Sequence, residues 1–487
     1  MSTSLWKEIP FRYPNLLRFF EEISAIPRES YHEEQIADYL VAFARERGLP
    51  YFRDALHNVF IEKPGSKGYE NHPVLLLQGH TDMVCEKNAG VAHDFATDPL
   101  DLYVEDGWLR ARGTTLGADD GVALAIMLAI LDGEIAEHPP IQCLFTSAEE
   151  VGMGGIEGFD FSYVTARSMI NLDSPDDLQI IAGCAGGMYS TLCIKADTIP
   201  CEDSLLRISI KGLAGGHSGE DIHRDRANAN VLLGRVLTAV VHATPLSLVS
   251  FDGGSKKNAI PREAVAVVAV KDVATATATI NTWRTLLRAE LTADDADFSL
   301  TSEQITADAP RAMSIADTER VLIGISKIPY GVLVRNRALG DSVELSCNLG
   351  VVETKHEGEQ SSVEISALAR SAETERLMVI EAELGLLARM IGATLERETF
   401  YGGWAYAENS AIREAFAASC EAITSQTPSV TVIHAGLECG TVKREIPDMD
   451  IISCGPQVRG LHSPDEALRL ASFEQFFAIM EHLLRNL

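Results

Sequence analysis

The sequence is short of basic residues. Its 487 residues contain 41 lysines and arginines against 70 aspartates and glutamates, which gives a formal net charge of −29. Nucleic acids and anionic membrane surfaces attract proteins that carry an excess of positive charge. We therefore expect neither nucleic acid nor a membrane among the partners of this chain, although the charge alone identifies no ligand.

Long apolar runs are also missing. No stretch approaches the roughly 20 apolar residues that a membrane-spanning helix needs. The segment from Met1 to Glu8 lacks the apolar core of a secretory signal peptide. The cysteines are odd in number, nine, and no CxxC pair or Cys/His cluster occurs among them, which favours free thiols over disulfides or a structural zinc site. These absences predict a soluble, cytoplasmic protein.

Apolar residues make up 46% of the chain, enough to form cores for the two or three domains that its length suggests. Up to about residue 190, and again after residue 400, buried-strand patterns alternate with helical patterns, which predicts an α/β fold with a mostly parallel sheet. Between these stretches a similar order of strands and helices occurs twice. We expect a catalytic domain formed by 1–188 and 401–487, interrupted by an inserted α+β domain over 189–400 made of two similar halves.

Polar residues follow the predicted buried strands of the first domain. The apolar run around Leu76 leads into His80, and the run from Ile141 to Phe145 leads into two adjacent glutamates. Because parallel strands end at one edge of a sheet, where ligands gather, these side chains should meet there. The residues expected at this edge are His80, Asp119, Glu149, Glu150 and Asp173.

Each of these residues also has an ordinary explanation. A Glu149–Glu150 pair by itself is most often a solvated acidic turn, and Asp119 ahead of an apolar helix is often an N-cap. His80 alone suits a hydrogen-bonded turn. Their occurrence together, each after a strand pattern, favours a functional site over five separate coincidences.

Without Glu149, the expected side chains and His462 from a late loop supply two imidazoles and three carboxylates. This donor set, which contains no cysteine, suits zinc, manganese or cobalt, and it is large enough for two ions that share one carboxylate. Glu149, next to the proposed ligand Glu150, is then available to accept a proton from water. Asp82 is placed to hydrogen-bond the second ring nitrogen of His80.

Five motifs resemble the co-catalytic zinc metallopeptidases that include aminoacylases and glutamate carboxypeptidases. They are Gly-His-Thr-Asp (79–82), Gly-Ala-Asp-Asp-Gly (117–121), Ser-Ala-Glu-Glu-Val-Gly (147–152), Asn-Leu-Asp-Ser (171–174) and Leu-His-Ser-Pro-Asp-Glu (461–466). Further segments, at 26–28, 57–58, 215–219, 258–262 and 434–438, are similar to the Xaa-His dipeptidases of this superfamily. Asp120-Gly121 departs from the Asp-Lys or Glu-Lys of many relatives and affects no proposed ligand.

The resemblance implies two Zn²⁺ ions per chain, with Co²⁺ or Mn²⁺ as substitutes. The implied ligands are His80 and Asp173 for one ion, Glu150 and His462 for the other, and Asp119 as the bridge. Asp82 would support His80, and Glu149 would act as general base and then as general acid. His217 would reach the substrate carbonyl when the inserted domain closes as a lid.

Three further residues are candidates for substrate binding. Asn258 and Arg370 are candidates to bind the free carboxylate of the substrate, because arginine suits carboxylates in a bidentate manner. Glu438 either faces the amino group of the substrate or simply ends a strand. The doubled length of the inserted domain leads us to expect that His217 serves its own chain, while a homodimer remains possible through another surface.

The sequence therefore predicts a cytoplasmic di-zinc dipeptidase that acts on small peptides with a free N-terminus, including Xaa-His and β-alanyl-histidine (carnosine). A tripeptidase or an N-acyl amino acid deacylase on the same metal site is the alternative. A non-catalytic metal-binding protein would not need Glu149, and a phosphoesterase would need a phosphate-binding loop that the sequence lacks.

Overall fold

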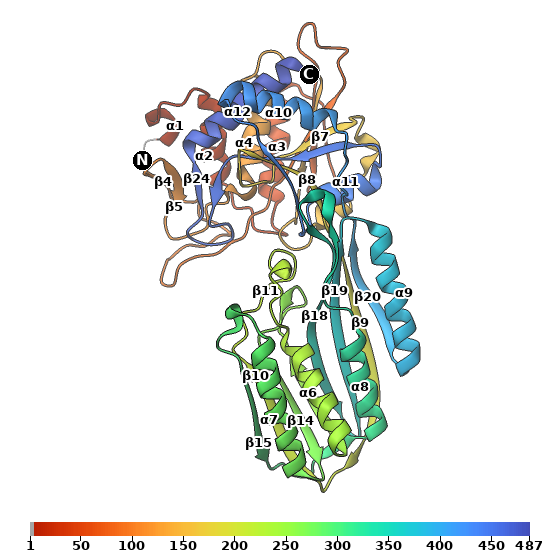
Figure 1. Cartoon of the computed structure of the whole chain (residues 1–487). Helices are drawn as coiled ribbons and strands as arrows, with labels where there is room; N and C mark the ends of the chain where they lie inside the picture. Colours follow the sequence, from red (N-terminus) through yellow and green to blue (C-terminus); the bar gives the residue numbers. More distant parts are fainter. Residues whose placement is uncertain (1–3) are drawn as a thin grey trace. The chain divides into compact units, whose positions relative to one another are not determined.

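The structure is a computed structural model that describes residues 4–487, and the chain divides into two compact units (Figure 1). Unit 1 comprises the residues up to Gly183 together with Ala405–Val432 and Leu437–Leu487, and unit 2 comprises Cys184–Trp404 and Ile433–Gly436. The predicted domain limits after residues 188 and 400 remain a prediction. The first change falls between β8 (Gln179–Cys184), in the sheet of unit 1, and β9 (Gly186–Pro200), in the sheet of unit 2. The second follows β20 (Thr394–Tyr401), which pairs with β9.

Unit 1 is built around an eight-stranded sheet. In spatial order its strands are β1 (Tyr51–Arg53), β2 (Val59–Lys63), β6 (Ile141–Thr146), β3 (Leu75–His80), β7 (Ser168–Asn171), β22 (Asp450–Ser453), β8 (Gln179–Cys184) and β21 (Ser429–Ile433). The central strands β6, β3, β7 and β22 are parallel. The pairs β1–β2, β2–β6 and β22–β8 are antiparallel, so the sheet as a whole is mixed.

Helices cover this sheet and form its core with it. They are α1 (Leu5–Glu8), α2 (Pro14–Ser24), α3 (Glu34–Arg47), α4 (Ala118–Asp132), α5 (Gly154–Glu157), α10 (Ala411–Thr424), α11 (Cys439–Glu445) and α12 (Leu470–Asn486). A smaller sheet contains β23 (Val458–Arg459), β24 (Ala467–Arg469), β5 (Trp108–Ala111) and β4 (Leu102–Glu105). Across residues 4–487, no helix combines the length and apolar character needed to cross a membrane.

Unit 2 contains a ten-stranded sheet whose strand pairs are antiparallel. Its main path runs through β15 (Ser299–Ile305), β10 (Ser204–Lys211), β14 (Ala264–Val270), β12 (Leu246–Gly253), β18 (Ser342–Glu357), β19 (Gln360–Ser371), β9 (Gly186–Pro200) and β16 (Arg311–Met313). Two more strands, β17 (Gly331–Asn336) and β20 (Thr394–Tyr401), pair with β18 and β9. A separate two-stranded ribbon joins β11 (Gly216–His217) to β13 (Ala259–Ile260).

The helices of unit 2 lie in a row along its large sheet (Figure 1). In chain order they are α6 (Ala229–Ala243), α7 (Val273–Glu290), α8 (Ile315–Lys327) and α9 (Thr374–Ile391). Helices α6 and α7 contact strands toward the β15 end of the sheet, and α9 contacts β19, β9 and β20 toward the other end. The expected division into two similar halves stays a prediction.

Burial patterns explain why the two sheets differ. Every residue of β3 and β6 is buried, as expected for parallel strands covered by helices on both faces. In β14 the buried residues alternate with partly exposed ones at its beginning, as expected where one face of an antiparallel sheet is covered. The apolar run and the alternating run in the sequence therefore correspond to two different kinds of sheet.

Candidate active site

The ends of the parallel strands in unit 1 carry the predicted site residues. His80 is the last residue of β3, Glu149 and Glu150 follow β6, and Asp173 follows β7. Asp119 lies at the start of α4, where a cis peptide bond joins it to Asp120. Four of the five expected residues thus follow parallel strands. Asp119, which was also expected after a strand, instead begins a helix and reaches this edge through its contact with His80.

Asp119 lies at the centre of this group. Its Oδ1 is 3.0 Å from His80 Nε2, and its Oδ2 is 3.2 Å from His462 Nε2. The same nitrogen of His462 is 3.2 Å from Glu150 Oε2. One carboxylate therefore contacts two imidazoles on opposite sides, which is the arrangement expected of a residue that bridges two metal ions.

Three groups of residues could each hold a metal ion, because within each group one possible ligand atom per residue lies within 4.8 Å of the others. The groups are His80, Asp119 and Asp173; Asp119, Glu150 and His462; and His80, Glu149 and Glu150. The first two share Asp119 and match the predicted division of ligands between two ions. The third shows that Glu149 also lies close to both ligand groups.

These residues suit divalent cations. Glu150 Oε1 is buried and has no hydrogen-bond partner among the described residues. Burial and the Asp119 charge raise the pKa of Asp173 to about 7, and burial raises the pKa of Glu149 well above its usual range. Imidazoles and carboxylates are the ligands of zinc, manganese and cobalt. Cations at this position would complete the unpartnered oxygen and offset the crowded negative charge.

Asp82 holds both sides of the group. His80 Nδ1 lies 3.4 Å from Asp82 Oδ1 and 3.2 Å from the Asp82 carbonyl oxygen, which leaves Nε2 for a metal. The Asp82 carboxylate also accepts the backbone N–H groups of Glu149 and Glu150 at 3.1 and 3.2 Å. Its predicted contact with His80 is present, and its hold on the glutamate turn was not foreseen.

The sequence analysis did not assign Glu466, which supports the Asp119 loop. Its carboxylate is buried and accepts the N–H groups of Leu116, Gly117 and Asp119 at 2.8, 2.9 and 3.1 Å. Glu466 closes the same motif that contains His462, so its position in that motif was the available signal. It fixes the backbone that presents the shared ligand Asp119.

Arg28 is a second supporting residue without a predicted role. The side chain is only 1% exposed, and it donates hydrogen bonds to the carbonyl oxygens of Thr81, Asp82 and Gly117 at 3.0, 3.0 and 2.5 Å. These carbonyls belong to the loops that follow His80 and precede Asp119. Arg28 therefore ties together two ligand-bearing loops.

A second polar cluster lies within unit 2. His217 on β11 pairs with Ala259 on β13, and the carbonyl oxygen of Asn258 accepts the Ser218 N–H at 2.9 Å. Arg370, near the end of β19, donates to Ser218 Oγ at 3.4 Å. The structure thus brings together three predicted residues, His217, Asn258 and Arg370, that are far apart in the sequence.

Arg370 is the charged centre of the second cluster. It is 4% exposed, it donates to the Tyr401 hydroxyl at 2.9 Å, and within residues 4–487 it forms no ion pair with an acid. Burial and the Arg370 charge lower the pKa of His217, and the same causes lower the pKa of His434 to about 3. A buried guanidinium without a carboxylate partner is suited to an anionic ligand.

His217 has a defined tautomer when it is neutral. Its Nδ1 accepts the N–H of Glu220 at 3.2 Å, so its proton lies on Nε2. The His217 N–H group of the backbone donates to Asp221 at 2.9 Å, which fixes the loop. The Nε2–H is therefore a candidate donor to a ligand oxygen.

Glu438 is fully buried at the start of α11. Its Oε2 accepts the Thr146 hydroxyl at 2.8 Å and the side-chain amide of Gln78, while Oε1 has no partner among the described residues. Burial raises its pKa to about 7. Both partners of Glu438 are buried strand residues, and neither indicates a ligand. The contact of Glu438 with a substrate amine therefore stays a prediction.

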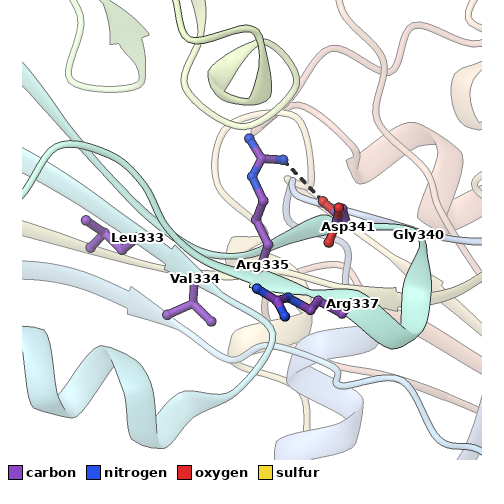
Figure 2. Close-up of a pocket in the computed structure, with 6 residues that line it drawn as sticks. All are labelled: Leu333, Val334, Arg335, Arg337, Gly340 and Asp341. Atoms are coloured by element: carbon purple, nitrogen blue, oxygen red, sulfur yellow. Dashed lines mark hydrogen bonds between the residues drawn. The ribbon is translucent and has the colours of Figure 1, made fainter.

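A hollow of about 750 Å³ in unit 2 shares no lining residue with the second cluster (Figure 2). It is lined by Leu333, Val334, Arg335, Arg337, Gly340 and Asp341. Arg335 donates to the Asp341 carbonyl oxygen at 3.2 Å. The hollow contains no histidine or cysteine, and we assign it no chemistry.

Two ligand groups that share a carboxylate are typical of metal-dependent hydrolases. Comparison with known proteins identifies the family. Residues 76–486 match peptidase family M20/M25/M40, and the chain belongs to this family. It is 37% identical over 473 residues to the cytosol non-specific dipeptidase of Escherichia coli strain K12, and the alignment covers 96% of both chains.

Solved structures agree with this assignment. The aminoacylhistidine dipeptidase of Vibrio alginolyticus is 37% identical to the chain, with a TM-score of 0.89 and coverage of 98% of this chain and 97% of the other. A tripeptidase from Staphylococcus aureus is 15% identical, with a TM-score of 0.59 and 98% coverage of both chains. The second similarity shows the fold alone.

Proposed function

We propose that this chain is a cytoplasmic, metal-dependent dipeptidase that hydrolyses dipeptides with a free N-terminus, including Xaa-His and β-alanyl-histidine. One observation carries the proposal: Asp119 belongs to two groups of possible metal ligands, and Glu149 lies close to residues of both groups. The names and the 37% identity of the two relatives, each covered almost completely, support dipeptides as substrates and the cytosol as the location.

Two zinc ions are the proposed cofactor, with Co²⁺ or Mn²⁺ as substitutes. His80 and Asp173 would hold one ion, Glu150 and His462 would hold the other, and Asp119 would contact both. Bound divalent cations lower the pKa of water and polarise a carbonyl group. The Asp82 contact keeps Nε2 of His80 directed toward the ligand group.

Glu149 is assigned the proton transfers. It lies within reach of His80 and Glu150, and burial together with the negative charges of its neighbours raises its pKa. A carboxylate of raised pKa is a better base toward water and can retain the proton. Glu149 would take a proton from the attacking water and deliver it to the leaving amine.

The second cluster supplies the groups proposed to bind the rest of the substrate. His217 would donate from Nε2 to the carbonyl oxygen as negative charge develops there. Arg370, which lacks an acidic partner within the described chain, would bind the free carboxylate, with Asn258 beside it. A free carboxylate one residue beyond the scissile bond is the feature that distinguishes dipeptides from longer peptides.

The proposal is tested by metal analysis together with a substrate panel. Mass spectrometry should find about two divalent ions per chain, and removal of metal should abolish turnover. Dipeptides, including Xaa-His and β-alanyl-histidine, should be cleaved faster than tripeptides or N-acyl amino acids. Faster turnover of either of the other classes would overturn the substrate assignment, and metal-independent turnover would overturn the mechanism.

Two ligand variants test how the ions are held. Asp119→Ala should lower occupancy at both metal positions, because this carboxylate belongs to both ligand groups. His462→Ala should chiefly empty one position, because His462 belongs to a single group. Equal losses of one ion in both variants would contradict the bridging role of Asp119.

A further inference from the structure

Asn258 in the second cluster combines a fixed backbone with a free side chain. Its carbonyl oxygen accepts the Ser218 N–H at 2.9 Å. Its side-chain amide is partly exposed and forms no hydrogen bond within residues 4–487. A free amide on a fixed backbone is suited to meet a ligand, because little order has to be gained on binding.

Asn348 holds the peptide groups on both sides of Asn258. It lies on β18 and is 1% exposed. Its side-chain nitrogen donates to the carbonyl oxygen of Lys257 at 3.3 Å and to that of Ala259 at 2.8 Å. An amide nitrogen carries two N–H groups, so both are used on the chain immediately before and immediately after Asn258.

Three successive carbonyl groups therefore have fixed partners. Those of Lys257 and Ala259 are bound by Asn348, and that of Asn258 is bound by the Ser218 N–H. Because each peptide group is planar, fixing these carbonyls leaves the backbone angles of Asn258 little freedom. The backbone angles in turn limit the rotamers that the Asn258 side chain adopts.

The amide of Asn348 is itself oriented by its neighbours. Its Oδ1 accepts from the side chain of Asn228 at 3.3 Å, and Asn228 also donates to the Leu349 carbonyl oxygen at 3.0 Å. Asn228 is fixed in turn as the N-cap of α6. The reverse orientation of the Asn348 amide would set its oxygen against two carbonyl oxygens, so its donors face the Asn258 loop.

Gly350 allows β18 to come close to this loop. A Cβ at this position would lie 2.4 Å from the Lys257 carbonyl oxygen, which no side chain tolerates without a shift of the backbone. The absence of a side chain at Gly350 thus permits the short distances that Asn348 requires.

We infer that Asn348 is a positioning residue that directs the side chain of Asn258 toward the substrate carboxylate. This role rests on the proposed function, in which Asn258 and Arg370 bind that carboxylate. Asn348 acts through Asn258 and touches no part of the substrate. Its contribution should therefore appear in KM for free dipeptides and leave kcat unchanged.

A double-mutant cycle in the metal-loaded full chain tests this role. Asn258→Ala should raise KM for free dipeptides by about tenfold, because a hydrogen bond to a charged group is lost. Asn348→Leu keeps the size but removes the donors, and should raise KM by about three- to tenfold. The double variant should have the KM of Asn258→Ala alone, because no amide is left to position.

The outcomes separate this role from the proposed function. If the two effects multiplied in the double variant, Asn348 would not act through Asn258, and the positioning role would fail while the carboxylate role of Asn258 stood. An unchanged KM in Asn258→Ala would overturn both. Dipeptide amides, which lack the carboxylate, should be affected little by Asn348→Leu. An equal rise in KM for these amides would show a general disturbance of unit 2 and overturn the positioning role.

Gly350→Ala gives a second test that does not alter the Asn348 side chain. The added Cβ would displace the Lys257 carbonyl, so KM for free dipeptides should again rise, and no further rise should occur in the Asn258→Ala background. An unchanged KM in Gly350→Ala would contradict the positioning role. Asn281→Leu, at an exposed asparagine of α7, is the control and should match the wild type. Circular dichroism of each variant checks that the fold is retained.

Discussion

The two polar clusters of this chain have opposite imbalances of charge. In unit 1, carboxylates gather around His80 and His462, and no lysine or arginine of the described residues forms an ion pair with them. In unit 2, the buried cation Arg370 is surrounded by neutral partners, Ser218 and Tyr401. The buried Arg28 interacts with Asp82 without forming an ion pair, and Arg370 has no acidic partner among the described residues, so the charge of each cluster is incompletely compensated.

The difference indicates what each cluster binds. Buried charges are costly unless they are paired, so a persistent imbalance is a sign of a ligand. An excess of carboxylates with two imidazoles suits divalent cations. An unpaired guanidinium suits a carboxylate, and a dipeptide carries one close to its scissile bond.

The largest expected effect comes from Glu149, the carboxylate proposed to bind no metal. Glu149→Gln should retain about two metal ions and lose about 10²–10⁴-fold in kcat, because only proton transfer is removed. Steady-state kinetics and metal analysis of the same preparation measure the two quantities.

Glu150→Gln is the matched control for the adjacent position. Glu150 belongs to a ligand group and carries an unpartnered buried oxygen, so this variant should lose metal as well as turnover. If Glu149→Gln also lost metal, Glu149 would be a ligand, and the contrast between the two glutamates would fail.

Arg370 is the corresponding test of the second cluster. Arg370→Met should raise KM for free dipeptides by about 10- to 150-fold, the cost of losing a hydrogen bond to a charged group of 1.5–3 kcal/mol. Dipeptide amides, which lack the carboxylate, should be affected little. Arg207→Met, an exposed position on β10 of the same unit, is the control. An equal rise in KM for dipeptide amides would show that Arg370 does not bind the substrate carboxylate.

Strand-end residues were accessible from the sequence because each follows a recognisable apolar run. His80 after the run at β3 and Glu150 after the run at β6 needed only the rule that parallel strands end together. The buried sheet of unit 1 and the alternating strands of unit 2 likewise follow from their patterns.

The supporting contacts were not accessible in this way. Glu466 binds the Asp119 N–H across 347 positions, and Arg28 reaches Gly117 across 89. No local pattern specifies such pairs, because they depend on how distant loops meet after folding. The same is true of Ser218, which links Asn258 and Arg370 in the second cluster.

A smaller effect should appear in the pH dependence of stability. Burial and the Arg370 charge lower the pKa of His434 to about 3, below its ordinary value of 6.5. Below pH 6.5 the unfolded chain then binds a proton that the folded chain does not, so stability falls as pH falls. His434→Gln removes the group that binds this proton. The free energy of unfolding should therefore fall less between pH 7 and pH 5 than in the wild type, by at most about 2 kcal/mol.

Urea unfolding at the two pH values measures this difference. His223→Gln, which replaces an exposed histidine of unit 2, is the control and should show the wild-type dependence. If the free energy of unfolding changed equally with pH in the wild type and in His434→Gln, burial and the Arg370 charge would not lower the pKa of this histidine.

The smallest expected effect concerns the orientation of Arg370. The Tyr401 ring lies over Gly187, where an added Cβ would come within 2.3 Å of the ring, so Tyr401→Phe should leave the ring in place. The change removes only the hydroxyl that accepts from Arg370 at 2.9 Å. Loss of about 1 kcal/mol of positioning should raise KM for free dipeptides a few-fold, with kcat and dipeptide amides unaffected. Tyr330→Phe, at an exposed tyrosine, controls for the substitution. An unchanged KM would show that Arg370 keeps its position without the Tyr401 hydroxyl. A fall in kcat would show that Tyr401 takes part in the chemical step and does more than position Arg370.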